Sequence, residues 1–156
     1  MDITIDVEDY KLNVRAAGIM IHNNKLLTHK SIDKDHYALI GGRITIGENS
    51  ATTIKREIME ETGKEIEILG YAGTIENFFE MDSKKYHEIM FVHQIEFVNE
   101  EDKKIEYTLS NIEGNKNLQY EWIDLNKIDE YEILPKAIKE ILKERKFPTH
   151  KINIDL

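Results

Sequence analysis

Three glutamates in one short segment have the residue types and spacing that could do chemistry. Glu57, Glu60 and Glu61 lie in a stretch whose apolar residues recur with helical spacing. On a helix the three carboxylates share an arc of about 100°, beside the apolar stripe. Carboxylates this close repel one another unless a cation lies among them. Because Mg²⁺ and Mn²⁺ prefer oxygen ligands and often share their coordination shell with substrate phosphates, the stripe is a candidate metal site.

A solvated acidic face is the ordinary alternative for this stripe, because glutamate is a good helix former. The glycine-rich stretch before it favours the metal site: Gly42 and Gly47 precede Glu48 and interrupt any helix. This stretch predicts a loop that leads directly into the glutamate helix. Arg56, four residues before Glu60, is expected to steer that carboxylate.

A helix over about residues 50–62 is predicted to carry the glutamates. Its apolar residues repeat at i, i+3 and i+7, the spacing of one buried helix face. Asn49 or Ser50 is a suitable N-cap, and Gly63 stands where a helix end favours positive φ. The helix therefore has recognisable signals at both ends.

Strand-like segments surround this helix on both sides. Runs rich in apolar, β-branched and aromatic residues predict strands over 14–21, from 26, over 37–40, 66–79, 86–98, 105–109 and 118–123. Hairpin turns are expected at 22–25 and 80–85. A second helix is predicted over 134–146, with Pro135 in its first turn. This order of elements predicts a mixed α+β protein.

Composition narrows the classes of function. The 156 residues suit one domain, 1–156. Lys and Arg total 21 against 30 Asp and Glu, and the net charge of −9 argues against binding long nucleic acid or an anionic membrane. The absence of cysteine excludes disulfides and thiolate chemistry. The acidic N-terminus lacks a long apolar run, which predicts a cytoplasmic protein.

The segment from Gly42 to Lys64 resembles the signature of the Nudix hydrolase family, G-x5-E-x7-R-E-U-x-E-E-x-G-U, where U is a bulky apolar residue. Every glycine and every charged position of the signature is present. Only Lys64 departs, since an apolar residue is usual there. Lys64 follows the predicted helix, so its departure is expected to affect local packing more than chemistry. Residues 122–125 also resemble a common C-terminal pattern of the family.

The resemblance implies an α/β/α sandwich with a mixed β-sheet. It also implies divalent-metal-dependent hydrolysis of a nucleoside diphosphate linked to another group. The implied ligands of Mg²⁺ or Mn²⁺ are the main-chain carbonyl of Gly42 and the carboxylates of Glu57, Glu60 and Glu61. Glu48 and Arg56 match the pair that orients the helix in the family.

The general base varies across the family. Glu60 is the first candidate for accepting the proton of the attacking water. Glu88, within a predicted strand, is the second, and an outward-facing strand residue is its alternative interpretation. Arg43 could contact a substrate phosphate or be solvated. Phe78 is a candidate for stacking on a nucleobase, although such aromatic residues more often belong to the core.

Several alternatives stay open at the level of sequence. The substrate is expected to be a nucleotide-type small molecule, either a nucleoside triphosphate, which the short chain mildly favours, or an ADP-ribose-like compound. The alternative function is a nucleotide-sensing domain that does not hydrolyse its ligand, and the intact glutamates argue against it. The chain could be a monomer or a homodimer. Residues 1–10 and 147–156 could form edge strands or pack on a partner.

Overall fold

The computed structural model describes residues 1–104 and 118–156, so the predicted strand over 105–109 lies outside the described residues. The strands are β1 (Thr4–Val7), β2 (Tyr10–Ile19), β3 (Ile21–His22), β4 (Lys25–Ser31), β5 (Ala38–Arg43), β6 (Ile66–Met81), β7 (Lys84–Phe97), β8 (Leu118–Asp124) and β9 (Thr149–Asp155). The helices are α1 (Ser50–Thr62) and α2 (Ala137–Glu144), with 3₁₀ turns η1 (Glu100–Lys103) and η2 (Leu125–Glu130).

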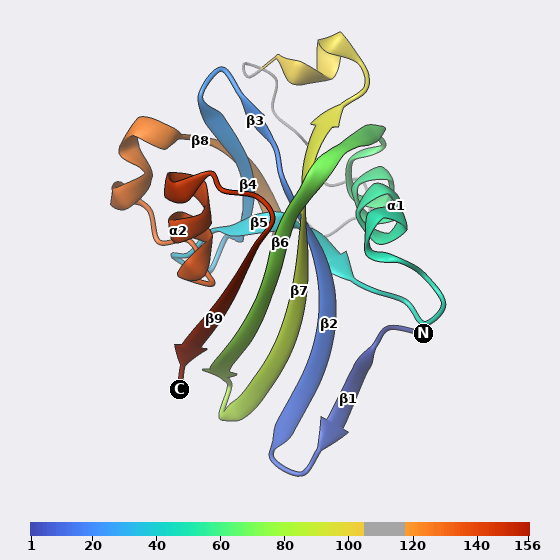
Figure 1. Ribbon diagram of the computed structural model, residues 1–156, viewed down its shortest axis with the longest axis vertical. Helices are drawn as coiled ribbons and strands as arrows, with labels where there is room; N and C mark the ends of the chain where they lie inside the picture. The colour runs from blue at the N-terminus through green and yellow to red at the C-terminus, as the bar shows by residue number, and fades with distance from the viewer. Residues whose placement is uncertain (105–117) are drawn as a thin grey trace.

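These strands form one mixed sheet within the described residues (Figure 1). Its order is β3-β4-β5-β2-β7-β6-β9, with β1 paired to β2 and β8 paired to β4. The pairs β2–β7 and β6–β9 are parallel, whereas the β6–β7 hairpin is antiparallel. Neighbouring strands in the sheet are therefore often distant in the chain, and the register between them decides which side chains meet.

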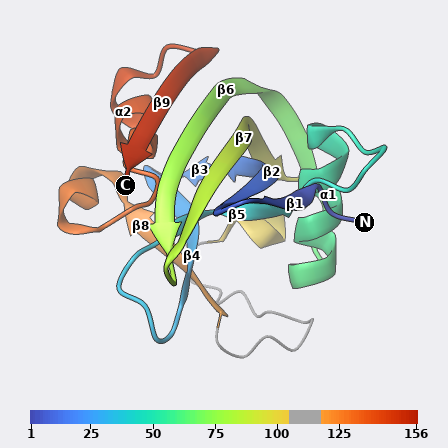
Figure 2. The same ribbon diagram turned by 90° about the horizontal axis from the view of Figure 1, so that it is seen from below.

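The two α-helices cover opposite faces of the sheet (Figure 2). Ile54 and Ile58 of α1 are buried with Ala16, Ile95 and Phe97 on one face. Alternate side chains along a strand point to opposite faces, so the neighbours of these strand residues face the other way. Burial on two faces gives the α/β/α arrangement that the family resemblance implied.

Helix α2 packs on the second face. Ile138 and Ile141 are buried there with Ala17, Ile75 and Val92. Ala16 and Ala17 thus serve different cores, because consecutive residues of β2 face opposite sides. The α2 core fills only part of this face, and the remaining part forms the wall of a cavity described below.

Most local predictions are confirmed. Helix α1 spans Ser50–Thr62, and the β6–β7 hairpin turns at Asp82 and Ser83, both with positive φ. The predicted helix over 134–146 is shorter than expected and spans Ala137–Glu144. Pro135 therefore precedes the helix and does not lie in its first turn. Within the described residues, neither α-helix is long and apolar enough to cross a membrane.

Both chain ends lie in strands of the sheet. Residues of β1 pair antiparallel with β2, and β9 pairs parallel with β6. The edge-strand interpretation of residues 1–10 and 147–156 is thereby confirmed. Both strands contribute side chains to a hydrogen-bonded row that crosses the sheet.

Candidate functional site

The loop after β5 leads into α1 through a well-defined cap. The Asn49 side chain accepts a hydrogen bond from the Thr52 N–H at 2.8 Å. At the other end, Gly63 adopts φ 71° and its N–H donates to the Met59 carbonyl. Of the two N-cap candidates, Asn49 is therefore the one that caps the helix. These caps define the helix turns on which the glutamates lie.

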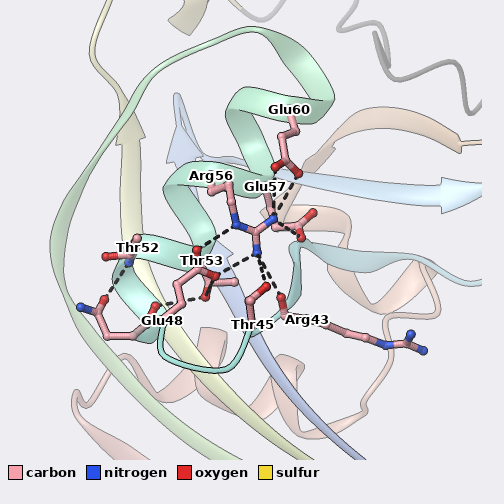
Figure 3. A network of polar contacts seen from close by, with 9 residues as sticks. Arg43, Thr45, Glu48, Thr52, Thr53, Arg56, Glu57 and Glu60 are labelled. Atoms are coloured by element: carbon pink, nitrogen blue, oxygen red, sulfur yellow. Dashed lines mark hydrogen bonds and ion pairs between the residues drawn. The ribbon is translucent and has the colours of Figure 1, made fainter. Parts of the chain in front are cut away.

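Arg56 and Glu48 form the central ion pair of the loop and helix (Figure 3). Arg56 Nε donates to Glu48 Oε2 and Nη2 donates to Oε1, each at 2.9 Å. Thr53 Oγ1 donates to the same carboxylate at 2.6 Å. The Arg56 guanidinium, followed by this hydroxyl, lowers the pKa of Glu48 to about 2. The structure thus pairs the two residues that the resemblance assigned to orienting the helix.

The same guanidinium contacts two glutamates of the acidic stripe. Arg56 Nη1 lies 3.0 Å from Glu57 Oε1 and 3.1 Å from Glu60 Oε2. The expected steering of Glu60 by Arg56 is therefore seen in the structure. The Glu60 side chain remains 44% exposed, whereas Glu57 is 17% exposed. Arg56 supplies the positive charge that lets these two carboxylates lie close together.

Glu61 points elsewhere. Its side chain is buried and Oε2 accepts a hydrogen bond from the Tyr120 hydroxyl of β8 at 2.8 Å. Across residues 1–104 and 118–156, no three Asp, Glu or His side chains are gathered into a ready metal cluster. The reason is visible in the contacts: Glu57 and Glu60 turn to Arg56, while Glu61 turns to Tyr120.

Gly42 brings the strand backbone against the acidic helix. A Cβ atom at Gly42 would stand 2.3 Å from Glu57 Cδ, so only glycine lets this carboxylate lie there undisturbed. The Gly42 carbonyl and the carboxylates of Glu57, Glu60 and Glu61 are all hard oxygen donors, the kind that Mg²⁺ and Mn²⁺ prefer. The donor set therefore fits a divalent cation.

A cavity of about 450 Å³ lies on the sheet face opposite α1, beside α2. Arg43 connects the two regions. Its backbone carbonyl accepts a bond from Arg56 Nη2 at 3.4 Å, while its side chain lines the cavity and points away from Arg56 in Figure 3. Arg15, the register partner of Arg43 in β2, also lines the cavity. Two cationic side chains from paired positions of β2 and β5 thus line the cavity.

The structure places the two remaining candidates on different faces. Glu88 lines the cavity and is only 5% exposed. Since α1 covers the other face, Glu88 is not grouped with Glu57, Glu60 and Glu61. Its role as the general base of the reaction stays a prediction. Phe78 is not among the cavity residues and stacks on His87, with ring centroids 4.4 Å apart. Its neighbour Phe79 lines the cavity instead, stacked on Tyr86 at 4.8 Å.

Sequence reasoning missed several residues of this region. The sequence predicted no role for Arg15, Asn13, Asn77 or Asn153, and it did not predict the contact between Tyr120 and Glu61. Asparagine is depleted in strands, so Asn77 within the predicted strand 66–79 was a usable signal. Asn13 and Asn153 lie outside the predicted strands and gave no such signal. Lys64, the departure from the signature, forms an ion pair with Asp102 at 2.7 Å.

Comparisons with known proteins agree with this arrangement. A sequence model of the NUDIX domain family matches residues 12–144. A MutT NUDIX hydrolase from Burkholderia pseudomallei aligns with TM-score 0.64 at 16% identity, covering 86% of this chain and 98% of that one. The MutT protein from Methanosarcina mazei Go1 gives 0.60 at 21% identity, covering 89% and 95%. An ADP-ribose pyrophosphatase from Streptococcus suis gives 0.56 at 10% identity, covering 90% and 98%.

Likeness to solved structures at these identities shows the shared fold, and the family match covers most of the chain and all of the segment from Gly42 to Lys64. Fold, signature and site geometry agree. The chain belongs to the NUDIX domain family and is a Nudix pyrophosphohydrolase.

Proposed function

We propose that this protein hydrolyses a pyrophosphate bond in a nucleotide-type small molecule, with Mg²⁺ or Mn²⁺ held by Glu57, Glu60, Glu61 and the Gly42 carbonyl. The observation that carries the proposal is the position of Arg43. Its backbone belongs to the Arg56 network and its side chain lines the cavity. A nucleotide with its phosphates at the acidic helix and its nucleoside in the cavity would lie beside Arg43.

The chain's own residues divide the work. Arg56 holds Glu48 through two hydrogen bonds and so fixes the loop against the helix. Arg43 and Arg15 offer guanidinium groups that suit phosphate oxygens. Glu60, the most exposed of the three glutamates paired with Arg56, is the candidate to accept the proton of the attacking water. A bound divalent metal supplies charge neutralisation and lowers the pKa of a water molecule.

Two substrate classes fit this proposal. Nucleoside triphosphates would be cleaved to the monophosphate and pyrophosphate, and ADP-ribose-like compounds would be cleaved between their two phosphates. Proteins of similar fold include MutT proteins and an ADP-ribose pyrophosphatase. We favour triphosphates, because one cavity of about 450 Å³ suits a single nucleoside better than two linked groups. The cytoplasmic location and the number of subunits stay predictions.

The test is phosphate and pyrophosphate release from the four nucleoside triphosphates, ADP-ribose, NADH and nucleotide sugars, with Mg²⁺, Mn²⁺ or EDTA. We expect metal-dependent turnover of one class, and Glu60→Gln should lower kcat at least about 100-fold. Glu65→Gln is the matched control, because Glu65 is an exposed carboxylate just after α1. Full turnover in EDTA, or equal activity of Glu60→Gln and Glu65→Gln, would contradict the proposal.

The alternative is a nucleotide sensor without hydrolysis. It would show tight nucleotide binding by calorimetry and no product release under any metal condition. The complete set of glutamates at Glu57, Glu60 and Glu61 favours the hydrolase over this alternative.

A further inference from the structure

A row of polar side chains crosses the sheet on the cavity face. Thr4, Asn13, Glu88, Asn77 and Asn153 are register partners in the neighbouring strands β1, β2, β7, β6 and β9. The last four line the cavity. Asn13, Asn77 and Glu88 are each at most 5% exposed. Burying so many polar groups costs free energy unless they satisfy one another, so their hydrogen bonds define what this surface can do.

Hydrogen bonds on the β9 side run in one direction. The backbone N–H of Ala137, at the start of α2, donates to Asn153 Oδ1 at 3.2 Å. Asn153 Nδ2 then donates to Asn77 Oδ1 at 3.0 Å, and Asn77 Nδ2 donates to Glu88 Oε1 at 3.4 Å. A backbone N–H can only donate, so it fixes the orientation of both amides. The series ends with a donor facing Glu88.

Hydrogen bonds on the β1 side end in the same way. Thr4 Oγ1 donates to Asn13 Oδ1 at 2.7 Å, and the Asn13 side chain bonds to Glu88. The Asn13 amide oxygen is occupied by Thr4, so its NH₂ group is the part that donates to Glu88. Arg15 Nε lies 3.9 Å from Glu88 Oε2. Donors from both sides therefore converge on one carboxyl group.

This convergence makes Glu88 a fixed hydrogen-bond acceptor. Burial raises the pKa of Glu88, and Arg15 and the two amides act against that rise. A carboxylate has about four acceptor positions, and Arg15 at 3.9 Å is too distant to fill one with a good hydrogen bond. Among the described residues, acceptor capacity therefore remains on Glu88, which lines the cavity. A ligand that offers N–H donors would complete it.

We propose that Glu88 determines substrate specificity by accepting two hydrogen bonds from a nucleobase that has adjacent N–H donors on one edge, as guanine has at N1 and its 2-amino group. This inference rests on the proposed function, because it takes the substrate to be a nucleotide whose base enters the cavity. Adenine and cytosine place an acceptor beside their amino group, and uracil and thymine flank one N–H with two carbonyls. Each of these four bases would place an acceptor lone pair opposite the carboxylate, which repels it.

The surroundings of Glu88 suit a base in this position. Tyr86 and Met90, two residues to either side on the same face of β7, provide apolar surface in the cavity. Arg15 and Arg43 line the same cavity from the paired strands β2 and β5, and Arg15 Nε lies 3.9 Å from Glu88 Oε2. A nucleotide bound by its base at Glu88 would have these two guanidinium groups near its phosphates.

A purely structural role makes a different prediction. If the row only joins strands, its removal lowers the melting temperature and leaves the preference among bases unchanged. If Glu88 reads the base, its replacement changes the preference even where the protein remains folded. Base preference therefore separates the two roles.

The experiment measures binding of GMP, IMP, AMP and UMP by calorimetry in EDTA, so that hydrolysis plays no part. IMP differs from GMP only by lacking the 2-amino group. We expect GMP to bind about 10-fold more tightly than IMP, since a good bidentate pair discriminates by about 1–3 kcal/mol. Glu88→Gln should lower GMP affinity about 10-fold and bring GMP and IMP within about 3-fold. Glu76→Gln, on the opposite face of β6, is the matched control and should behave like the wild type.

Asn153→Ala provides a second test, should Glu88→Gln fail to fold. Asn153 does not contact Glu88, but it holds the Asn77 amide in its donating orientation. As a positioning residue it should reduce the GMP-over-IMP preference about 2- to 5-fold. Thermal melts of each variant show whether it is folded.

Equal binding of all four monophosphates by the wild type would overturn the inference, as would an unchanged GMP preference in folded Glu88→Gln. The absence of any nucleotide binding would overturn it too. Hydrolysis without base preference would reject the role of Glu88 and leave the proposed function standing. Selective GMP binding without hydrolysis of any triphosphate would do the reverse.

Discussion

At the scale of single residues, the site depends on how each glutamate is held. Arg56 is shared among Glu48, Glu57 and Glu60, whereas Glu61 is bound by the Tyr120 hydroxyl. Groups that hold a metal ligand from behind affect metal affinity, because they fix the orientation of its carboxylate. Tyr120 is such a group if Glu61 is a metal ligand, as we propose.

Removal of that hydroxyl tests this positioning role. Tyr120→Phe should raise the Mg²⁺ concentration for half-maximal activity about 10-fold, the order found when outer partners of metal ligands are lost. At saturating Mg²⁺ the activity of Tyr120→Phe should approach that of the wild type, because Phe retains the packing of the ring. Tyr131→Phe, in the α2-side core, is the control and should leave the metal dependence unchanged. A titration curve for Tyr120→Phe identical to that of the wild type would exclude the role.

At the scale of elements, β5 lies unusually close both to β2 and to the Glu57 side chain of α1, and two glycines make this possible. Gly41 and Gly42 are consecutive, yet they face different surroundings. A Cβ at Gly41 would stand 2.1 Å from the Ala16 backbone oxygen, whereas one at Gly42 would meet the end of the Glu57 side chain. Backbone cannot move aside without disrupting the β2–β5 pairing, but a glutamate side chain can rotate away. We therefore expect Gly41 to matter for folding and Gly42 for the position of the Glu57 carboxylate.

Alanine at these two positions should separate stability from activity. Gly41→Ala should lower the free energy of unfolding by about 3 kcal/mol or prevent folding, as expected for backbone overpacking. Gly42→Ala should change stability by about 1 kcal/mol or less and lower kcat more than 10-fold, because the Glu57 carboxylate is displaced. Urea denaturation and steady-state kinetics measure both effects. A fully active Gly42→Ala would show that the contact between Gly42 and Glu57 is dispensable.

At the scale of the whole molecule, the sheet separates two environments. One face carries α1 and the proposed metal ligands, and the other carries α2 and the cavity. His29 of β4 lines that cavity, and its buried Nδ1 has no hydrogen-bond partner among the described residues. Burial, followed by the charge of Arg15, lowers the pKa of His29 to about 4. The folded protein therefore keeps this imidazole neutral where the unfolded chain would protonate it.

This difference predicts an acid-sensitive stability. Between pH 6.5 and about 4 the unfolded state binds the His29 proton more readily, so the free energy of unfolding falls as the pH drops through that window. The contribution is roughly 2 kcal/mol after allowance for partial solvent contact. Urea denaturation at pH 7 and pH 5 should show a smaller loss for His29→Gln than for the wild type. Glu88, whose pKa shift acts in the opposite sense, is common to both proteins and cancels in the comparison. Equal losses would contradict the assignment.

The sequence by itself determined what depends on near neighbours along the chain. The caps at Asn49 and Gly63, the helix Ser50–Thr62 and the spacing of Arg56 from Glu60 all follow from periodicity and local backbone preferences. The same holds for the glycine-and-glutamate signature, because its residues lie in one continuous segment from the end of β5 through α1. Helix ends and side-chain spacing within one segment can therefore be predicted from the sequence of that segment.

Only the tertiary structure decided which distant residues meet. Asn153 and Asn77 are 76 positions apart and touch because β9 pairs in parallel with β6 in one register. A slip of one residue would turn every side chain of a strand to the other face, which is why Phe79 lines the cavity and Phe78 does not. Likewise Tyr120 reaches Glu61 through the placement of β8 beside β4. Strand order and register are global properties, so neither the polar row with Glu88 at its centre nor the different partners of Glu57, Glu60 and Glu61 could be predicted from spacing along the chain.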